Sequence, residues 1–170
     1  MNTTAQESKQ QNLTALISRI EQTHHVFTRE SIARIESLLA ASGQADSNNI
    51  QRCFDELKAD LLPHLLKEER VLFPYIVALE SRPEQAPDSC FGSIANPIRM
   101  MGAEHQAVKN LLLRLRELTA DYRVSPQADA AASALYAALA ALDRDLVEHI
   151  RVENDELFPQ ALTLEKNSAG

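Results

Sequence analysis

The sequence predicts an all-α protein, an antiparallel up-down-up-down four-helix bundle. Glycine occurs four times and tryptophan not at all in 170 residues, while alanine, leucine, glutamate and arginine are plentiful. That mix favours helix over sheet. Apolar residues recur at helical spacing in four long segments, and short turn-rich stretches separate them, which favours antiparallel neighbours. We expect one domain over residues 1–170, with a core of about 10–163 and frayed ends.

The first predicted helix covers residues 10 to 41. Apolar side chains recur at helical spacing from Leu13 to Leu39. Residues 1 to about 10 read as a frayed tail. The stretch that follows the helix, residues 42–49, reads SGQADSNN and is rich in turn-forming residues. Its last residues cap helices well, so we expect a loop there and a second helix directly after it.

The second predicted helix covers about residues 49 to 80 and contains two prolines, Pro63 and Pro74. An interior proline removes a backbone hydrogen bond and usually kinks a helix. The apolar periodicity continues through both prolines, so we expect one helix. A kink at Pro63 would help to aim His64, the next side chain. The alternative is a pair of shorter helices, broken near residue 63.

The third predicted helix covers about residues 97 to 122. The longest loop, residues 81–95, precedes it and carries two prolines and a glycine. Asn96 and Pro97 then give a helix start, with asparagine as the cap and proline at the first helical position.

The fourth predicted helix covers about residues 126 to 163. Ser125 and Pro126 repeat the same start signal, which leaves a link of only residues 123–125. The first half of this helix is rich in alanine, which allows close approach of a neighbouring helix. We expect residues 164–170 to fray.

One stretch of the sequence is written twice, on the second and fourth predicted helices. Residues 60–74 read DLLPHLLKEERVLFP and residues 145–159 read DLVEHIRVENDELFP, an offset of 85 (145 minus 60). Seven of the fifteen positions are identical, and the shared core is His-x-x-x-Glu-x-x-x-Leu-Phe-Pro. Residues four apart on a helix have Cβ atoms roughly 6 Å apart on one face. Each copy can therefore direct an imidazole and a carboxylate to a common metal site.

Two further histidines, His25 and His105, fall on the first and third predicted helices. A bundle would bring four imidazoles and two carboxylates into one layer of its core, where di-iron sites are known to be built. Burying these groups without a metal would be costly. The predicted ligands are His25, His64, Glu68, His105, His149 and Glu153.

The predicted cofactor is a pair of non-haem iron ions.

 An oxide or hydroxide would bridge the two ions, and Glu68 and Glu153 would bridge them as well. Pairing the histidines by sequence half would give one iron to His25 and His64, and the other to the histidines of the second half. Two imidazoles, two carboxylate oxygens and one bridge leave an octahedral position open on each iron, for a small molecule such as O2 or NO. The ligand types also leave manganese and zinc open.

His24 directly precedes His25, and adjacent helical residues point about 100° apart, so both cannot face the core. We choose His25 because Arg29 follows it by four residues, as Lys109 follows His105.

Three acids are candidates for hydrogen bonds to the outer nitrogens of the ligand imidazoles. Asp60 and Asp145 lie one helical turn before His64 and His149, and each is equally consistent with a solvated surface acid. Glu104, next to a predicted ligand, is a weaker candidate.

The charge and the apolar pattern exclude several classes of partner. The net charge of −7, from 24 acids and 17 bases, argues against nucleic acid and anionic membranes. No apolar run approaches the roughly 20 residues of a membrane span, and the first 15 residues lack a signal-peptide core. We therefore expect a cytoplasmic protein, in which Cys53 and Cys90 are free thiols. The oligomeric state stays open.

These residues resemble the hemerythrin-like, HHE cation-binding superfamily over about residues 20 to 163. Within it, the chain is most similar to the di-iron proteins that repair iron–sulfur clusters, whose four histidines and two bridging glutamates match the six predicted ligands. The stretches that carry the resemblance are HHVFTRE (24–30), LLPHLLKEERVLFP (61–74), NPIRMMGAEH (96–105), LRELTADY (115–122) and LVEHIRVENDELFPQAL (146–162).

The resemblance implies repair or protection of iron–sulfur clusters under nitrosative or oxidative stress, through reaction with NO or O2 at the two irons. Damaged iron–sulfur proteins would be the partners. The sequence has no counterpart of the cysteine-bearing N-terminal domain of many members, which puts any thiol-dependent step in doubt. Two alternatives stay open: an O2 or NO binding or sensing protein without repair activity, and a di-iron NO reductase or peroxidase. Whether the protein is an enzyme is not decided by the sequence.

Overall fold

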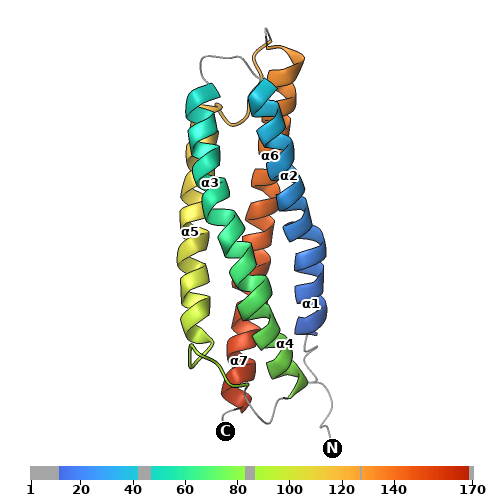
Figure 1. The fold of residues 1–170 in the computed structure, drawn as a ribbon, viewed down its shortest axis with the longest axis vertical. Coiled ribbons are helices and arrows are strands. Elements are labelled where there is room, and N and C mark those ends of the chain that lie inside the picture. The colour runs from blue at the N-terminus through green and yellow to red at the C-terminus, as the bar shows by residue number, and fades with distance from the viewer. Residues whose placement is uncertain (1–11, 42–46, 83–86, 127, 169–170) are drawn as a thin grey trace, which may run out of the picture.

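The computed structural model describes residues 12–41, 47–82, 87–126 and 128–168. Within these ranges the chain forms four helical rods and no strand, which confirms the predicted all-α bundle (Figure 1). Three rods contain a π-helical segment, labelled η. The elements in chain order are α1 (Leu13–Ile20), η1 (Glu21–His25), α2 (Val26–Ala41), α3 (Ser47–Lys67), η2 (Glu68–Leu72), α4 (Phe73–Ser81), α5 (Ala95–Leu118), α6 (Ala130–Val152), η3 (Glu153–Leu157) and α7 (Phe158–Ser168).

The first rod packs mainly on the fourth, and the second packs mainly on the third. The closest packing joins α2 to α6 and α3 to α5, while α2 with α3, and α5 with α6, touch less. The helices run along one long axis, and α1, α4 and α7 share one end of the bundle (Figure 1). Each half of the chain therefore packs its helices mainly against those of the other half.

Two apolar clusters fill the bundle. One cluster joins α2, α3, α5 and α6 and includes the buried side chains Ile35, Phe54 and Leu139. The other joins α1, α4 and the C-terminal helices and includes Ile20 and Phe73. Buried histidine and glutamate side chains form a polar layer between the clusters. Apolar packing on both sides thus supplies the stability that lets the fold bury these polar groups.

The second rod shows how the chain tolerates its prolines. Pro63 lies inside α3, which continues to Lys67, so the alternative of a break near residue 63 is wrong. Pro74 lies in the first turn of α4, directly after the π-helical segment η2. The expected helix over 49–80 is therefore observed, with a π-helical segment inside it.

The third rod starts earlier and ends earlier than predicted. It begins at Ala95, and the Asn96 side chain donates a hydrogen bond to the Phe91 carbonyl instead of capping the helix. It ends at Leu118, because residues 120–122 all adopt left-handed backbone conformations, with φ of 48°, 57° and 59°. None of these three residues is a glycine, so the sequence carried no stop signal there.

The fourth rod is shifted toward the C-terminus. The predicted start at Pro126 is wrong, because the helix begins at Ala130 and Asp129 caps it, accepting a hydrogen bond from the Ala132 N–H at 2.7 Å. At the other end, helix continues to Ser168, beyond the predicted limit at residue 163. The tail expected over residues 1 to 10 lies outside the described residues.

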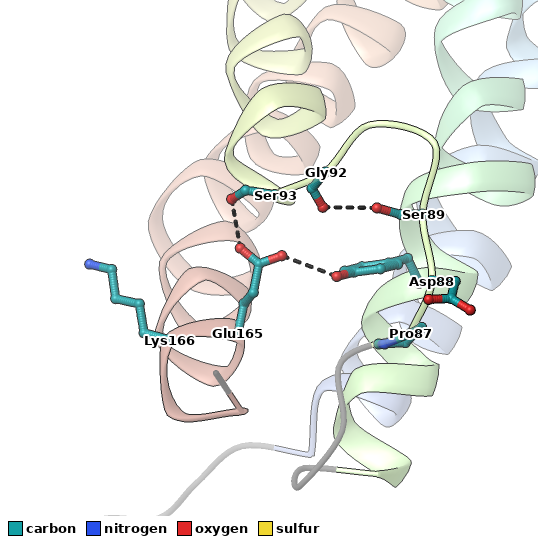
Figure 2. A pocket seen from close by; sticks show the side chains of 8 residues that line it. Pro87, Asp88, Ser89, Gly92, Ser93, Glu165 and Lys166 are labelled. Atoms are coloured by element: carbon teal, nitrogen blue, oxygen red, sulfur yellow. Dashed lines mark hydrogen bonds between the residues drawn. The ribbon is translucent and has the colours of Figure 1, made fainter. Parts of the chain in front are cut away.

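The internal repeat extends to two glutamates that cap helices. Glu80 accepts hydrogen bonds from the backbone N–H groups of Leu13 and Thr14, at 2.7 and 2.8 Å, at the start of α1. Glu165, 85 residues later, accepts from the Ile94 N–H at 2.8 Å at the start of α5. Figure 2 shows its other oxygen accepting from the Ser93 hydroxyl, at 2.7 Å. In each half of the chain, a carboxylate from the end of the second helix thus caps the N-terminus of the first helix. The helix dipole favours negative charge at that N-terminus.

Replacing Glu80 by alanine should lower the free energy of unfolding by about 1–2 kcal/mol, since it leaves helix N–H groups without an acceptor. The matched control is Glu30→Ala, at an exposed position of α2, which should change stability by less than about 0.5 kcal/mol. Chemical denaturation of the three proteins measures the difference. Equal stability of the two variants would contradict a capping role.

Candidate metal centre

The three π-helical segments each carry a residue of the predicted site. His25 ends η1, Glu68 begins η2 and Glu153 begins η3. A π-helical turn is an insertion in a regular helix that is frequent at functional sites. The segments at Glu68 and Glu153 start at equivalent positions of the repeat. His105, by contrast, projects from the regular helix α5.

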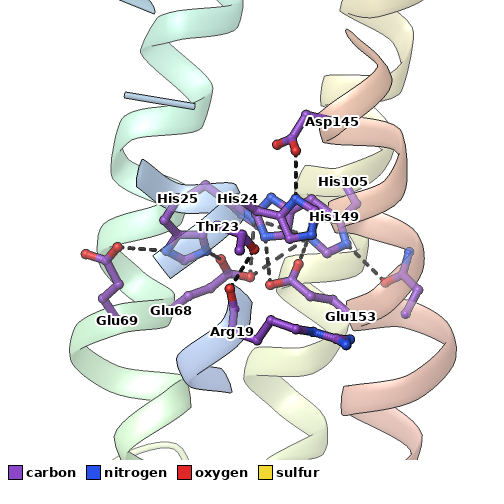
Figure 3. Close-up of polar contacts among 12 residues, drawn as sticks. Arg19, Thr23, His24, His25, Glu68, Glu69, His105, Asp145, His149 and Glu153 are labelled. Carbon is purple, nitrogen blue, oxygen red and sulfur yellow. Dashed lines mark hydrogen bonds and ion pairs between the residues drawn. The ribbon is translucent and has the colours of Figure 1, made fainter. Parts of the chain in front are cut away.

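The six predicted ligands form two overlapping groups, and all six side chains are buried. Within each group the potential ligand atoms all lie within 4.8 Å of one another. Both glutamates belong to both groups (Figure 3). The groups are His25, Glu68, His149 and Glu153, and His64, Glu68, His105 and Glu153.

The expected pairing of histidines by sequence half is wrong. His25 shares a group with His149, and His64 shares one with His105. The helix packing gives the reason, because the first rod packs on the fourth and the second packs on the third. Each metal position therefore takes one histidine from each half of the chain.

Each glutamate presents one oxygen to each group. Glu68 Oε2 lies 3.4 Å from Nε2 of His25, and its Oε1 lies 3.3 Å from Nε2 of His64. Glu153 Oε1 lies 3.0 Å from Nε2 of His149, and its Oε2 lies 3.1 Å from Nε2 of His105. This is the arrangement of two carboxylates that bridge a pair of cations.

Several of these inward-facing atoms lack a hydrogen-bond partner within the described part of the chain. They are His25 Nε2, both oxygens of Glu68 and Glu153 Oε2. Burying polar atoms without hydrogen-bond partners costs free energy, so such a cluster indicates a site for a ligand. Imidazole nitrogens and carboxylate oxygens suit iron, manganese and zinc. The residues present thus fit a pair of transition-metal ions.

Three of the four imidazoles are held from behind by hydrogen bonds at Nδ1. The acceptors are Glu69 for His25, at 2.7 Å, and Glu104 for His64, at 2.8 Å. The sequence predicted both Asp60 and Glu104 as hydrogen-bond partners of ligand imidazoles, but Asp60 is exposed. Such bonds fix the tautomer of a ligand imidazole and raise its basicity.

Asn154 holds the third imidazole, that of His105, with its Oδ1 3.0 Å from Nδ1. The sequence interpretation missed Asn154 and Glu69. A signal was present, because each directly follows a glutamate of the repeat. Both acceptors thus occupy equivalent positions in the two halves.

Basic residues hold two of these acceptors at the surface. Arg29 donates two hydrogen bonds to Glu69, both at 2.9 Å, and Lys67 donates to Glu104. These contacts orient each carboxylate toward its histidine and offset its charge.

Asp145 does not pair with His149, the contact expected from their spacing. Its Oδ1 instead lies 2.9 Å from Nδ1 of His24, and the His24 ring stacks on the His149 ring (Figure 3). His24 is thus outside the two groups of ligand atoms, as expected, but it contacts the site.

The buried carboxylates change the protonation of the imidazoles. Burial lowers the pKa of His64, but the neighbouring carboxylates of Glu68 and Glu104 outweigh this and raise that pKa to about 9. Burial also opposes the charge on His149, but Glu153 raises its pKa. Burial would raise the pKa of Glu153, yet the two neighbouring histidines hold it well below its usual range.

We expect the stability of the metal-free protein to fall as pH rises from 6.5 to 9. The folded-state pKa of His64, about 9, lies above its ordinary value of 6.5, so its contribution is complete below pH 6.5 and lost through pH 9. The loss is at most about 3 kcal/mol for a shift of this size. Chemical denaturation at pH 6.5, 7.5 and 9 measures it.

The metal-loaded protein is the control for this pH dependence. A metal on Nε2 excludes the proton, so loading should release protons and remove the His64 contribution to the slope. A metal-free protein whose stability is unchanged over this range would contradict the raised pKa.

The sequence matches one protein-family model and several curated relatives. The model of the hemerythrin HHE cation binding domain matches residues 16–161. The iron-sulfur cluster repair protein DnrN of Neisseria gonorrhoeae is 30% identical over 152 residues, which cover 87% of this chain and 90% of that protein. The iron-sulfur cluster repair protein YtfE of Yersinia pseudotuberculosis is 33% identical over 166 residues, 93% of this chain and 70% of that protein.

Other relatives are matched only in part. The iron-sulfur cluster repair protein YtfE of Edwardsiella ictaluri is 39% identical over 109 residues, which are 64% of this chain and 44% of that protein. The chain thus spans less than half the length of some curated relatives that it matches. No described helix is both long and apolar enough to cross a membrane. The match over residues 16–161 includes all six residues of the two groups, and the chain belongs to the hemerythrin HHE cation-binding family.

Proposed function

We propose that the protein holds two iron ions and repairs or protects iron–sulfur clusters damaged by nitric oxide or oxidative stress. One observation carries the metal assignment: Glu68 and Glu153 each present one oxygen to each of the two groups of ligand atoms. The repair role rests on the relatives, which are named iron-sulfur cluster repair proteins.

The proposed centre assigns a role to each residue around it. His25 and His149 would hold one iron, His64 and His105 would hold the other, and the two glutamates would be shared between them. The outer acceptors hold three of the imidazoles with Nε2 directed inward. Two ferrous ions held by these residues would supply electrons to a small molecule such as NO or O2.

The apolar clusters on both sides of the centre exclude bulk water from it. Glu68 and Glu153 are fully buried, so solvent would screen their attraction for bound metal ions only weakly. Two ferrous ions carry four positive charges and the glutamates cancel two of them, which favours a further anionic bridge.

The proposal places the protein in the cytoplasm, with damaged iron–sulfur proteins as its partners. Cys53 is buried and Cys90 is exposed, and a reducing compartment would keep both as free thiols. A protein that acts on clusters of other proteins also needs to be in the compartment where those clusters are used.

Recovery of a damaged cluster enzyme tests the repair role. A dehydratase that needs an iron–sulfur cluster is inactivated with NO, and the iron-loaded protein is then added without oxygen. Recovery well above that obtained with free ferrous iron at the same concentration is expected. The matched control is the Glu68→Ala variant, which should give no more recovery than free iron.

The same preparation separates the alternatives. No recovery, together with a stable and reversible O2 or NO adduct, would replace repair by binding or sensing. No recovery, together with release of N2O from NO or with turnover of peroxide, would replace it by a reductase or a peroxidase. Iron content and the visible spectrum before and after NO are measured in each case.

A further inference from the structure

The two halves of the chain surround the metal positions with matching residues, except at one place. Glu104, directly before His105, accepts the hydrogen bond of His64 from the second half. The residue directly before His25 is His24. His24 therefore stands where the other half has a carboxylate.

His24 gives the facing imidazole no acceptor. The His24 and His149 rings lie parallel, with centroids 5.2 Å apart and an interplanar angle of 4°. Nδ1 of His24 is bonded to Asp145, as described above. Within the described part of the chain, Nδ1 of His149 is buried and has no hydrogen-bond partner.

Asp145 could have supplied the missing acceptor, since it lies one helical turn before His149. Its Oδ1 is bonded to His24 instead, and its Oδ2 is buried without a partner among the described residues. His24 thus removes two acceptors from His149: the carboxylate that its own position would carry by symmetry, and the carboxylate of Asp145.

We propose that His24 makes the two metal positions unequal, so that the metal held by His25 and His149 is bound more weakly and leaves first. An outer hydrogen bond to a ligand histidine typically contributes 10–100-fold to metal affinity. The metal held by His64 and His105 has two such bonds, and the other has one. The inference rests on the proposed two-metal centre and deepens it, because an iron that leaves readily could be passed to a damaged cluster.

Release of iron to a chelator tests the inequality. The protein is loaded with two ferrous ions without oxygen and mixed with excess ferrozine, and the absorbance of the ferrous complex is followed. Two phases of equal amplitude are expected, with rates that differ at least about tenfold. A single phase that releases both irons at one rate would overturn the inference.

Two single variants assign the phases. In His24→Gln, the new side chain can donate to Asp145 and offer its carbonyl oxygen to His149, so the fast phase should slow about tenfold. The matched change in the other half is Glu104→Gln, which weakens the acceptor of His64. It should speed the slow phase and leave the fast phase unchanged. A fast phase that responds to Glu104→Gln but not to His24→Gln would overturn the assignment.

Cobalt binding gives a second measurement that does not depend on activity. Successive additions of Co(II) to the metal-free wild-type protein should fill the two positions one after the other, with different visible spectra for the first and second equivalents. Two indistinguishable equivalents would count against the inference even if a variant failed to fold. A protein that binds no iron or cobalt would instead refute the two-metal centre itself.

Discussion

Replacing Glu68 or Glu153 by alanine is expected to abolish binding of two metals. Each glutamate is fully buried and presents its two oxygens to different groups of ligand atoms, so its loss removes one ligand from both metals. Affinity should fall by more than the roughly 100-fold that outer partners of a metal site contribute. The readout is the number of iron ions per chain after desalting. The wild type is expected to retain two.

Thermal unfolding gives an independent readout of the same variants. A ligand that binds only the folded state stabilises it, by about 4 kcal/mol when the free ligand is at 1,000 times its Kd. Loading should therefore raise the Tm of the wild type clearly and leave the Tm of Glu68→Ala unchanged.

Glu69→Gln provides a graded control for the bridging variants. Its side chain lies next to Glu68 in the sequence but accepts a hydrogen bond from Nδ1 of His25 without facing the metals. It should weaken binding only by about 10–100-fold. Full iron content in both bridging variants would refute the bridging assignment.

The candidate metal ligands could be predicted from the sequence because four of them lie in a repeated motif. One His-x-x-x-Glu pair on a helix is common on surfaces, whereas His64 with Glu68 and His149 with Glu153 recur in a matched context. Helical periodicity then places both pairs on inward faces. The structure brings these four residues together with His25 and His105.

Which histidines share a metal position could not be predicted in the same way. It depends on which rods pack most closely, and the repeat describes each half without describing how the halves meet. The packing of α2 on α6 joins His25 to His149, although 124 residues separate them (149 minus 25).

Outer partners were predicted poorly for a related reason. Asp145 lies on the same helix as His149 at a favourable spacing, yet a residue from another helix, His24, takes its hydrogen bond. Competition between helices of this kind leaves no mark in the local spacing of either one.

A partly buried ion pair that the sequence does not signal lies at the end of the third helix. Asp143 and Asp145 look alike in the run DRD, but Asp143 is 2% exposed. Arg116 donates two hydrogen bonds of 2.6 Å to it, and the Tyr122 hydroxyl donates a third, also at 2.6 Å. This network anchors the left-handed turn, where each non-glycine residue costs about 1–2 kcal/mol.

Arg116→Ala is therefore expected to lower the free energy of unfolding by about 1–3 kcal/mol, because the Asp143 carboxylate loses two of its three hydrogen bonds. The Arg116 side chain is 37% exposed, so solvent screening keeps the loss below that of a fully buried ion pair. Arg114→Ala is the matched control on the same helix. Arg114 pairs with Glu56, and both side chains are about half exposed, so its loss should cost less than about 1 kcal/mol.

A double-mutant cycle separates the ion pair from the packing of the arginine side chain. Asp143→Ala in the Arg116→Ala background removes the unpaired charge, so the double variant should be more stable than the sum of the two single losses predicts, by about 1–3 kcal/mol. Urea denaturation of the wild type, the two single variants and the double variant gives this coupling energy. Additive losses would mean that Arg116 stabilises the turn by packing alone, and the left-handed residues 120–122 would then need another anchor.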